Sequence, residues 1–161
     1  MNIPRLALGS GLVAAMFSIA PALAACGSGQ TPGYGDISSV RYEKTACYGV
    51  CPSFEVSFSR AGLTYTGRDN VARIGNYTSS ETGKFDDVVA LLSRLQFYSF
   101  KVKPVFVTDV PHYIISVERC GVNTSLDWRA MVYTGASGGD FGALFNGLDR
   151  ITNSVVWRKA P

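Results

Sequence analysis

Residues 54–66, with the sequence FEVSFSRAGLTYT, decide the fold. Every second residue from Phe54 to Phe58 is apolar and the residues between them are polar, which is typical of a strand with one buried face. Arg60-Ala61-Gly62 is a turn signal, and residues 63–66 return as a second strand. The stretch therefore predicts a β-hairpin with one apolar face.

The same alternation predicts further strands on both sides of this hairpin. Val40 and Tyr42 alternate with charged residues, and the turn Arg119-Cys120-Gly121 separates two alternating segments that form a second predicted hairpin. The additional strands are expected near residues 40–43, 71–78, 113–117, 122–128 and 154–157, with Gly67 and Gly75 at bends or bulges.

Two other segments carry apolar residues at helical spacing. In both, apolar residues recur at i, i+3, i+4, i+7 and i+10, which is the stripe of an amphipathic helix. Asp140 precedes the second stripe and is expected to cap that helix. The first stripe consists of Phe85, Val88, Val89, Leu92 and Leu95, and the second of Phe141, Leu144, Phe145, Leu148 and Ile151.

The order of these elements predicts an α+β fold, in which an antiparallel sheet of hairpins is covered by two amphipathic helices. A hairpin followed by a helix occurs twice, which suggests an internal duplication. The alternative is that unrelated hairpin–helix units look alike at this level of detail.

Residues 1–25 have the features of an export signal, namely a positive start, a mostly apolar run and a break at Pro21. Ala22-Leu23-Ala24 fits cleavage in ordinary secretion. Leu23-Ala24-Ala25-Cys26 resembles the lipobox of bacterial lipoproteins, which implies a lipid on Cys26. We favour the lipoprotein and retain ordinary secretion as the alternative.

The glycine-rich residues 26–36 predict a flexible tether, and residues 37–158 a single α+β domain. The chain has 15 basic and 12 acidic residues, and removal of the signal takes one basic residue and no acidic one. Nucleic-acid binding requires a concentrated basic footprint, which the sequence lacks. We expect a bacterial cell-envelope protein, lipid-anchored to the membrane through Cys26 or free in the periplasm.

Cys47-Tyr48-Gly49-Val50-Cys51-Pro52 is the strongest local motif. An oxidising compartment favours a structural disulfide between Cys47 and Cys51. A thiol-redox pair is disfavoured, because thioredoxin-like sites place C-x-x-C at a helix N-terminus and here C-x-x-x-C precedes a strand. If Cys26 is lipidated, Cys120 is a leftover thiol. If it is not, the four cysteines allow three full pairings.

Soft-metal binding is the alternative for the same motif, because two thiolates and a third ligand can bind Cu(I). C-x-x-x-C-P resembles the copper-site motif of the Sco copper chaperones, which implies His112, the only histidine, as third ligand. Cys120 is another candidate ligand. The Sco motif leads into a helix, whereas a strand follows Pro52 here, so we place the disulfide first and expect no cofactor.

Gly135-Ala136-Ser137-Gly138-Gly139 matches the G-x-S-x-G of a nucleophile elbow. No histidine follows Ser137, so the hydrolase order of serine, acid and histidine is incomplete. We interpret the segment as a loop, in which the backbone of Gly138 and Gly139 at a helix start is a candidate anion site. Asp109 is interpreted as a turn residue before the next strand.

The cysteine motif, the strand that follows it, the hairpin at Gly62 and the later Thr-Asp-Val-Pro segment together resemble a known bacterial family. Its members are exported or lipoprotein-type domains recorded only as a domain of unknown function, with the motif C-[FY]-G-x-C-P-x-[FY]. The resemblance extends over residues 38–157. It implies a small α+β domain in the envelope and no established activity. Arg60-Ala61-Gly62 departs from the family's acidic turn, and Cys120 is an addition.

The sequence contains no complete catalytic constellation, which weighs against an enzyme. We therefore expect a non-enzymatic envelope module that binds a protein partner or a small ligand through its sheet face or its Cys47–Cys51 loop. The alternative is a soft-metal or thiol-redox protein that uses Cys47 and Cys51 with His112 or Cys120.

Overall fold

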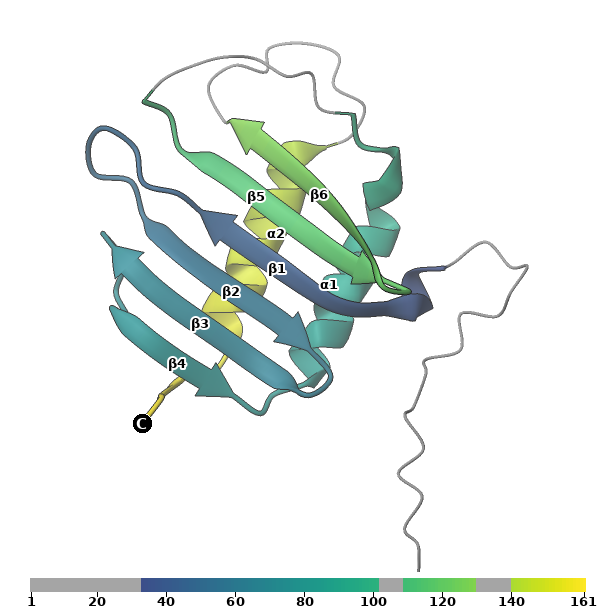
Figure 1. Cartoon of the computed structure of the whole chain (residues 1–161), viewed down its shortest axis with the longest axis horizontal. Helices are drawn as coiled ribbons and strands as arrows, with labels where there is room; N and C mark the ends of the chain where they lie inside the picture. Colours follow the sequence, from purple (N-terminus) through teal and green to yellow (C-terminus); the bar gives the residue numbers. More distant parts are fainter. Residues whose placement is uncertain (1–32, 102–108, 130–139) are drawn as a thin grey trace, which may run out of the picture.

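A computed structural model describes residues 33–101, 109–129 and 140–161. These residues form one antiparallel sheet of seven strands together with two α-helices (Figure 1). The strands are β1 (Ile37–Lys44), β2 (Ser53–Ser59), β3 (Gly62–Asp69), β4 (Gly75–Ser79), β5 (His112–Arg119), β6 (Val122–Arg129) and β7 (Arg158–Lys159). The helices are α1 (Gly83–Arg94) and α2 (Phe141–Ser154), and the 3₁₀ turns are η1 (Tyr34–Asp36) and η2 (Phe97–Ser99).

The strand order is β6-β5-β1-β2-β3-β4-β7, so the two predicted hairpins lie on either side of β1. Both hairpins are confirmed. At the first turn Gly62 has a φ of +146°, which L side chains rarely adopt. At the second turn Cys120 and Gly121 both have positive φ, as the two-residue turns of type I′ require.

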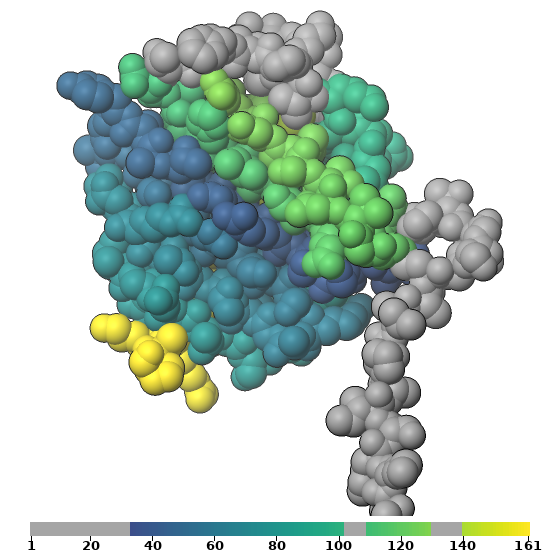
Figure 2. All heavy atoms as spheres, viewed as in Figure 1, coloured from purple at the N-terminus to yellow at the C-terminus, as the bar shows by residue number. Residues whose placement is uncertain are grey.

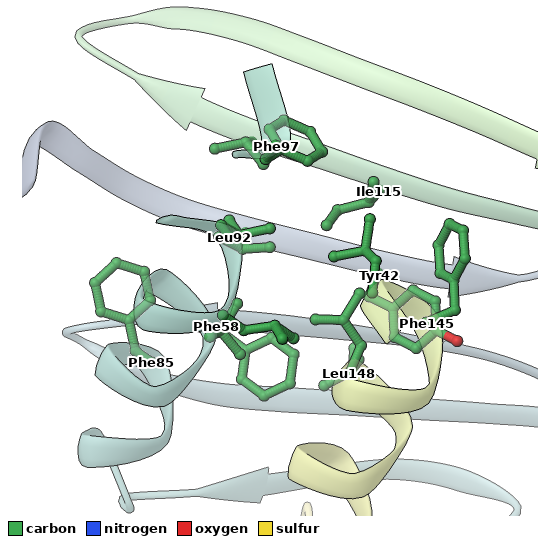
Figure 3. Close-up of a cluster of buried hydrophobic side chains, with 14 of the residues drawn as sticks. Tyr42, Phe58, Phe85, Leu92, Phe97, Ile115, Phe145 and Leu148 are labelled. Carbon is green, nitrogen blue, oxygen red and sulfur yellow. The ribbon is translucent and has the colours of Figure 1, made fainter. Parts of the chain in front are cut away.

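One face of the sheet carries the core, and both helices lie behind it (Figure 1). Side chains from the strands, such as Tyr42, Phe58 and Ile115, meet Leu92 of α1 and Leu148 of α2 (Figure 3). Each of these five side chains is fully buried. Burial of a side chain of this size contributes roughly 1.5–3 kcal/mol, so this layer is the main source of stability.

The helical stripes predict the buried faces well. Phe85, Val88 and Leu92 of α1 are buried as expected, and Leu91 joins them. In α2 the first four residues of the predicted stripe are buried. The Asp140 carboxylate accepts a hydrogen bond of 2.7 Å from the Ala143 amide, which confirms it as the N-cap.

No described helix lies in front of the opposite face of the sheet, whose strands face the viewer (Figure 2). Successive strand residues point to opposite faces, so Arg41 and Glu43 of β1 lie on this open face with Glu55 of β2. The result is a sheet-dominated α+β fold with one buried and one open face.

Two strand predictions are wrong in extent. The strand expected at residues 154–157 does not form, because α2 continues to Ser154 and the last strand is Arg158–Lys159. Only the second half of 71–78 is a strand, since β4 begins at Gly75 and the preceding residues form the β3–β4 loop.

The folded part is also longer than residues 37–158. Tyr34, in the predicted tether, packs its ring 5.3 Å from that of Tyr98. At the other end the Ala160 amide donates a 2.9 Å hydrogen bond to the Asn76 carbonyl. Among the described residues, no helix combines the length and apolar character needed to span a bilayer.

Candidate functional site

The Cys47–Cys51 loop connects β1 to β2 and is closed by a disulfide, as predicted. The two Cα atoms are 5.6 Å apart, and Gly49 between them has a φ of +134°, which favours glycine. Tyr48 and Val50 flank that glycine and are 91% and 87% exposed. The loop therefore holds two apolar side chains in solvent on a covalently closed turn.

The residues of the alternative metal site are not assembled into a ligand set. The sulfurs of Cys47 and Cys51 are joined in the disulfide, and the His112 Nδ1 lies 3.0 Å from a carboxylate oxygen of Asp127. Within the described ranges, no three His, Cys, Asp or Glu side chains are grouped so as to hold a metal ion. Cys120 is disulfide-bonded as well, so the expectation of a leftover thiol is wrong.

The other residues singled out from the sequence do not belong to the Cys47–Cys51 loop. Cys26, Ser137, Gly138 and Gly139 lie outside the described residues. Asp109 lies at a bend ahead of β5 with a φ of +65°, in agreement with its interpretation as a turn residue.

A buried polar cluster lies at the end of β1, the strand that leads into the disulfide loop. Lys44 is only 8% exposed, and its Nζ is 2.6 Å from Oδ2 of Asp149 on α2. The Tyr42 hydroxyl donates to Oδ1 of the same carboxylate at 3.0 Å. The Lys44 ammonium also lies 5.0 Å from the centroid of Tyr113 and 5.6 Å from that of Phe54, within the range of cation–π attraction.

This environment raises the pKa of two tyrosines, Tyr42 and Tyr113, that interact with Asp149. Burial, the Asp149 charge and the hydrogen bond to it together raise the pKa of Tyr42 far above its ordinary value. Burial and the same charge raise the pKa of Tyr113. Both phenols therefore stay neutral at physiological pH, and Tyr42 serves as a hydrogen-bond donor.

A cavity of about 220 Å³ opens beside this cluster, between the end of β1, the start of β2, the middle of β3, the β3–β4 loop and α2. Its aromatic wall is Phe54 and Tyr65, whose rings are stacked with centroids 5.5 Å apart. Thr152 of α2 also lines the cavity. It is 3% exposed, and its Oγ1 has no hydrogen-bond partner among the described residues.

Arg73 lines the rim of the cavity from the β3–β4 loop. The loop closes tightly on β3, because the carbonyl group of Arg73 occupies the space where residue 67 would carry a Cβ. Gly67 is therefore required for this loop position. Burial raises the pKa of the Tyr65 phenol. The positive charge of Arg73 lowers that pKa, but by less than burial raises it.

The open face carries a separate ion-pair network of Arg41 and Arg68 with Glu43 and Glu55. The hydrogen bond to Glu55 raises the pKa of Arg41, and the hydrogen bond to Glu43 raises that of Arg68. Two positive and two negative charges compensate one another here, so the network joins β1, β2 and β3 without leaving a net charge.

Sequence reasoning missed Lys44, Asp149, Thr152 and Arg73 as candidate site residues. One signal was available, since Lys44 continues the inward series of Val40 and Tyr42 on β1. A lysine at an inward position of a strand requires a partner. The other three residues come together only through packing of α2 and the β3–β4 loop.

These features define a small sheet-dominated α+β domain with a disulfide-closed loop next to a cavity that has a polar cluster at its side. A family model for a domain of unknown function, DUF6438, matches residues 38–135, and the chain belongs to that family. The match includes β1 to β6 and the cysteine motif, while α2 follows it. No curated protein and no solved structure matches the chain. The comparisons therefore assign no function.

Proposed function

We propose that this protein is a non-enzymatic binding module of the bacterial cell envelope, exported by residues 1–25, which recognises a protein partner through its Cys47–Cys51 loop. The observation that carries the proposal is the exposure of Tyr48 and Val50, at 91% and 87%, on a loop closed by a disulfide.

Exposed apolar side chains of this kind suit an interface. Aromatic residues are enriched among those that dominate binding energies, since one ring buries a large area at low entropic cost. The disulfide restricts the loop before binding and reduces the entropy lost on association. The β3–β4 loop lies beside the disulfide loop, since the Asn70 side-chain amide donates to the Cys51 carbonyl at 3.3 Å, and Ile74 on that loop is a further exposed apolar residue, at 56%.

The disulfide also supports the proposed location, because such bonds persist in oxidising compartments. A lipid on Cys26 would instead place the module at a membrane surface, but Cys26 is the only cysteine of the chain left to pair with the disulfide-bonded Cys120.

Site-specific photo-crosslinking in the source organism tests the proposal. A photoreactive residue at position 48 is expected to give an adduct of one defined mass. The matched control is position 122, because Val122 is also an exposed apolar residue, at 65%, but lies in β6 at the opposite end of the sheet (Figure 1).

Added purified protein should compete for the partner and lower the yield of the adduct, whereas its Tyr48→Ser/Val50→Ser variant should leave the yield unchanged. Equal crosslinking from positions 48 and 122, or equal competition by both proteins, would contradict recognition through the loop.

A further inference from the structure

We propose that the cavity beside Lys44 is a binding site for a small organic monocarboxylate. The site is separate from the exposed tip of the Cys47–Cys51 loop, and the proposal does not depend on the protein partner.

The charges around the cavity indicate an anion. Lys44 and Asp149 compensate each other through their 2.6 Å ion pair. Arg73 is the remaining charged residue of the lining, and it has no ion pair with any described residue. The lining therefore has one uncompensated positive charge, which matches a monoanion better than a phosphate group carrying nearly two negative charges.

The polar groups support a carboxylate in particular. An arginine fork matches the two oxygens of a carboxylate. The hydroxyl of Thr152 lacks a partner although the residue is 3% exposed, and a buried hydroxyl normally has one. As a donor it would complete the hydrogen bonding of a ligand oxygen.

The apolar wall and the volume of the cavity indicate the shape and size of the part of the ligand that bears the carboxylate. Phe54 and Tyr65 give one apolar aromatic side, suited to a ring or a branched chain. A volume of about 220 Å³ is below the range of roughly 300–1,000 Å³ found for drug-sized ligands, so a compact acid is required. Benzoate has these properties and serves as the probe.

The test is a titration of the exported protein with benzoate, followed by backbone amide NMR. We expect saturable shifts at residues 70–73 and 152–153, with benzamide, the neutral analogue, and inorganic phosphate each binding at least about tenfold more weakly. Arg73→Gln should weaken benzoate binding by about tenfold or more, since it removes a charge-assisted hydrogen bond.

Thr152→Val, which keeps the shape and removes the hydroxyl, should weaken benzoate binding by several-fold. Arg150→Gln is the matched control, because Arg150 is exposed on α2 and does not line this cavity. Its benzoate affinity should equal that of the wild type.

Equal shifts with benzamide would reduce the site to an apolar cavity and overturn the proposal, and tighter binding of phosphate would overturn the ligand class. Equal losses in Arg73→Gln and Arg150→Gln would also overturn it, as would no saturable binding. None of these results bears on crosslinking at position 48, so the two proposals fail independently.

Discussion

Tyr42 places its ring in the core and its hydroxyl against the Asp149 carboxylate. We predict that Tyr42→Phe lowers the free energy of unfolding at pH 7 by about 1–2 kcal/mol, since it removes a hydrogen bond to a charged acceptor. Urea denaturation of both proteins measures the difference. An unchanged midpoint would show that the hydroxyl does not contribute.

The same residue gives a prediction for alkaline pH. The pKa of Tyr42 is raised in the folded state, so above about pH 10, the pKa of an unfolded tyrosine, the folded chain keeps a proton that the unfolded chain loses. The free energy of unfolding is therefore constant below that pH, as far as Tyr42 is concerned, and falls above it. Tyr42→Phe should make this fall shallower between pH 9 and 11, and equal slopes would contradict the assignment.

Lys44 and Asp149 should behave as a coupled pair. Lys44→Met leaves a half-buried carboxylate with Tyr42 as its remaining partner in the cluster, and we expect a loss of about 1–3 kcal/mol. Adding Asp149→Asn removes that charge and should recover part of the loss. Urea denaturation of the two single variants and the double variant gives the coupling energy, and strict additivity would contradict a direct interaction.

At the scale of elements, prediction from sequence succeeded where the pattern is local. Both hairpins and both helices follow from alternation or helical spacing within about a dozen residues. The loop at residues 70–74 did not follow, because its path depends on the close approach of Arg73 to Gly67 on β3. For the same reason the cavity could not be predicted, since it joins β1, the β3–β4 loop and α2.

Two glycines test this explanation. In Gly67→Ala the new Cβ would lie 2.8 Å from the carbonyl carbon of Arg73, so the loop must move, at a cost of about 1–3 kcal/mol. Gly83, the first residue of α1, has nothing within 4 Å of a Cβ, and Gly83→Ala should leave stability equal or higher. Thermal unfolding compares the two variants. Equal changes would contradict the close approach.

The disulfide has its own measurable contribution. Replacing Cys47 and Cys51 by serine opens the short loop, and loop-closure entropy predicts a loss of about 2 kcal/mol. Urea denaturation of the double variant measures it. The sheet should persist in circular dichroism because its pairing does not depend on the loop, and a collapse of the β signal would show otherwise.

For the whole molecule, the state of Cys26 is the decisive chemical question. Once Cys47 and Cys51 are joined, a non-lipidated Cys26 has Cys120 as its only possible partner within the chain. A thioether to lipid and a disulfide to Cys120 exclude each other, because one sulfur cannot form both bonds.

Because Cys120 is disulfide-bonded and Cys26 is the only cysteine of the chain left to pair with it, we predict a Cys26–Cys120 disulfide and no incorporation of labelled palmitate in the source organism. Mass mapping of the same material under non-reducing conditions provides the second measurement. A Cys26–Cys120 linked peptide is the expected result, and a Cys26 peptide that carries lipid would contradict it.

In the lipid-anchored alternative, the position of β1 within the sheet has a mechanical consequence. Residue 37 begins this strand and the Cys47–Cys51 loop follows its other end, so an anchor at the N-terminus and a partner at the loop would pull on opposite ends of β1 (Figure 1). Tension between membrane and partner would then pass along the covalent backbone of a single extended strand. The direct path of this tension would bypass the helices and the outer strands.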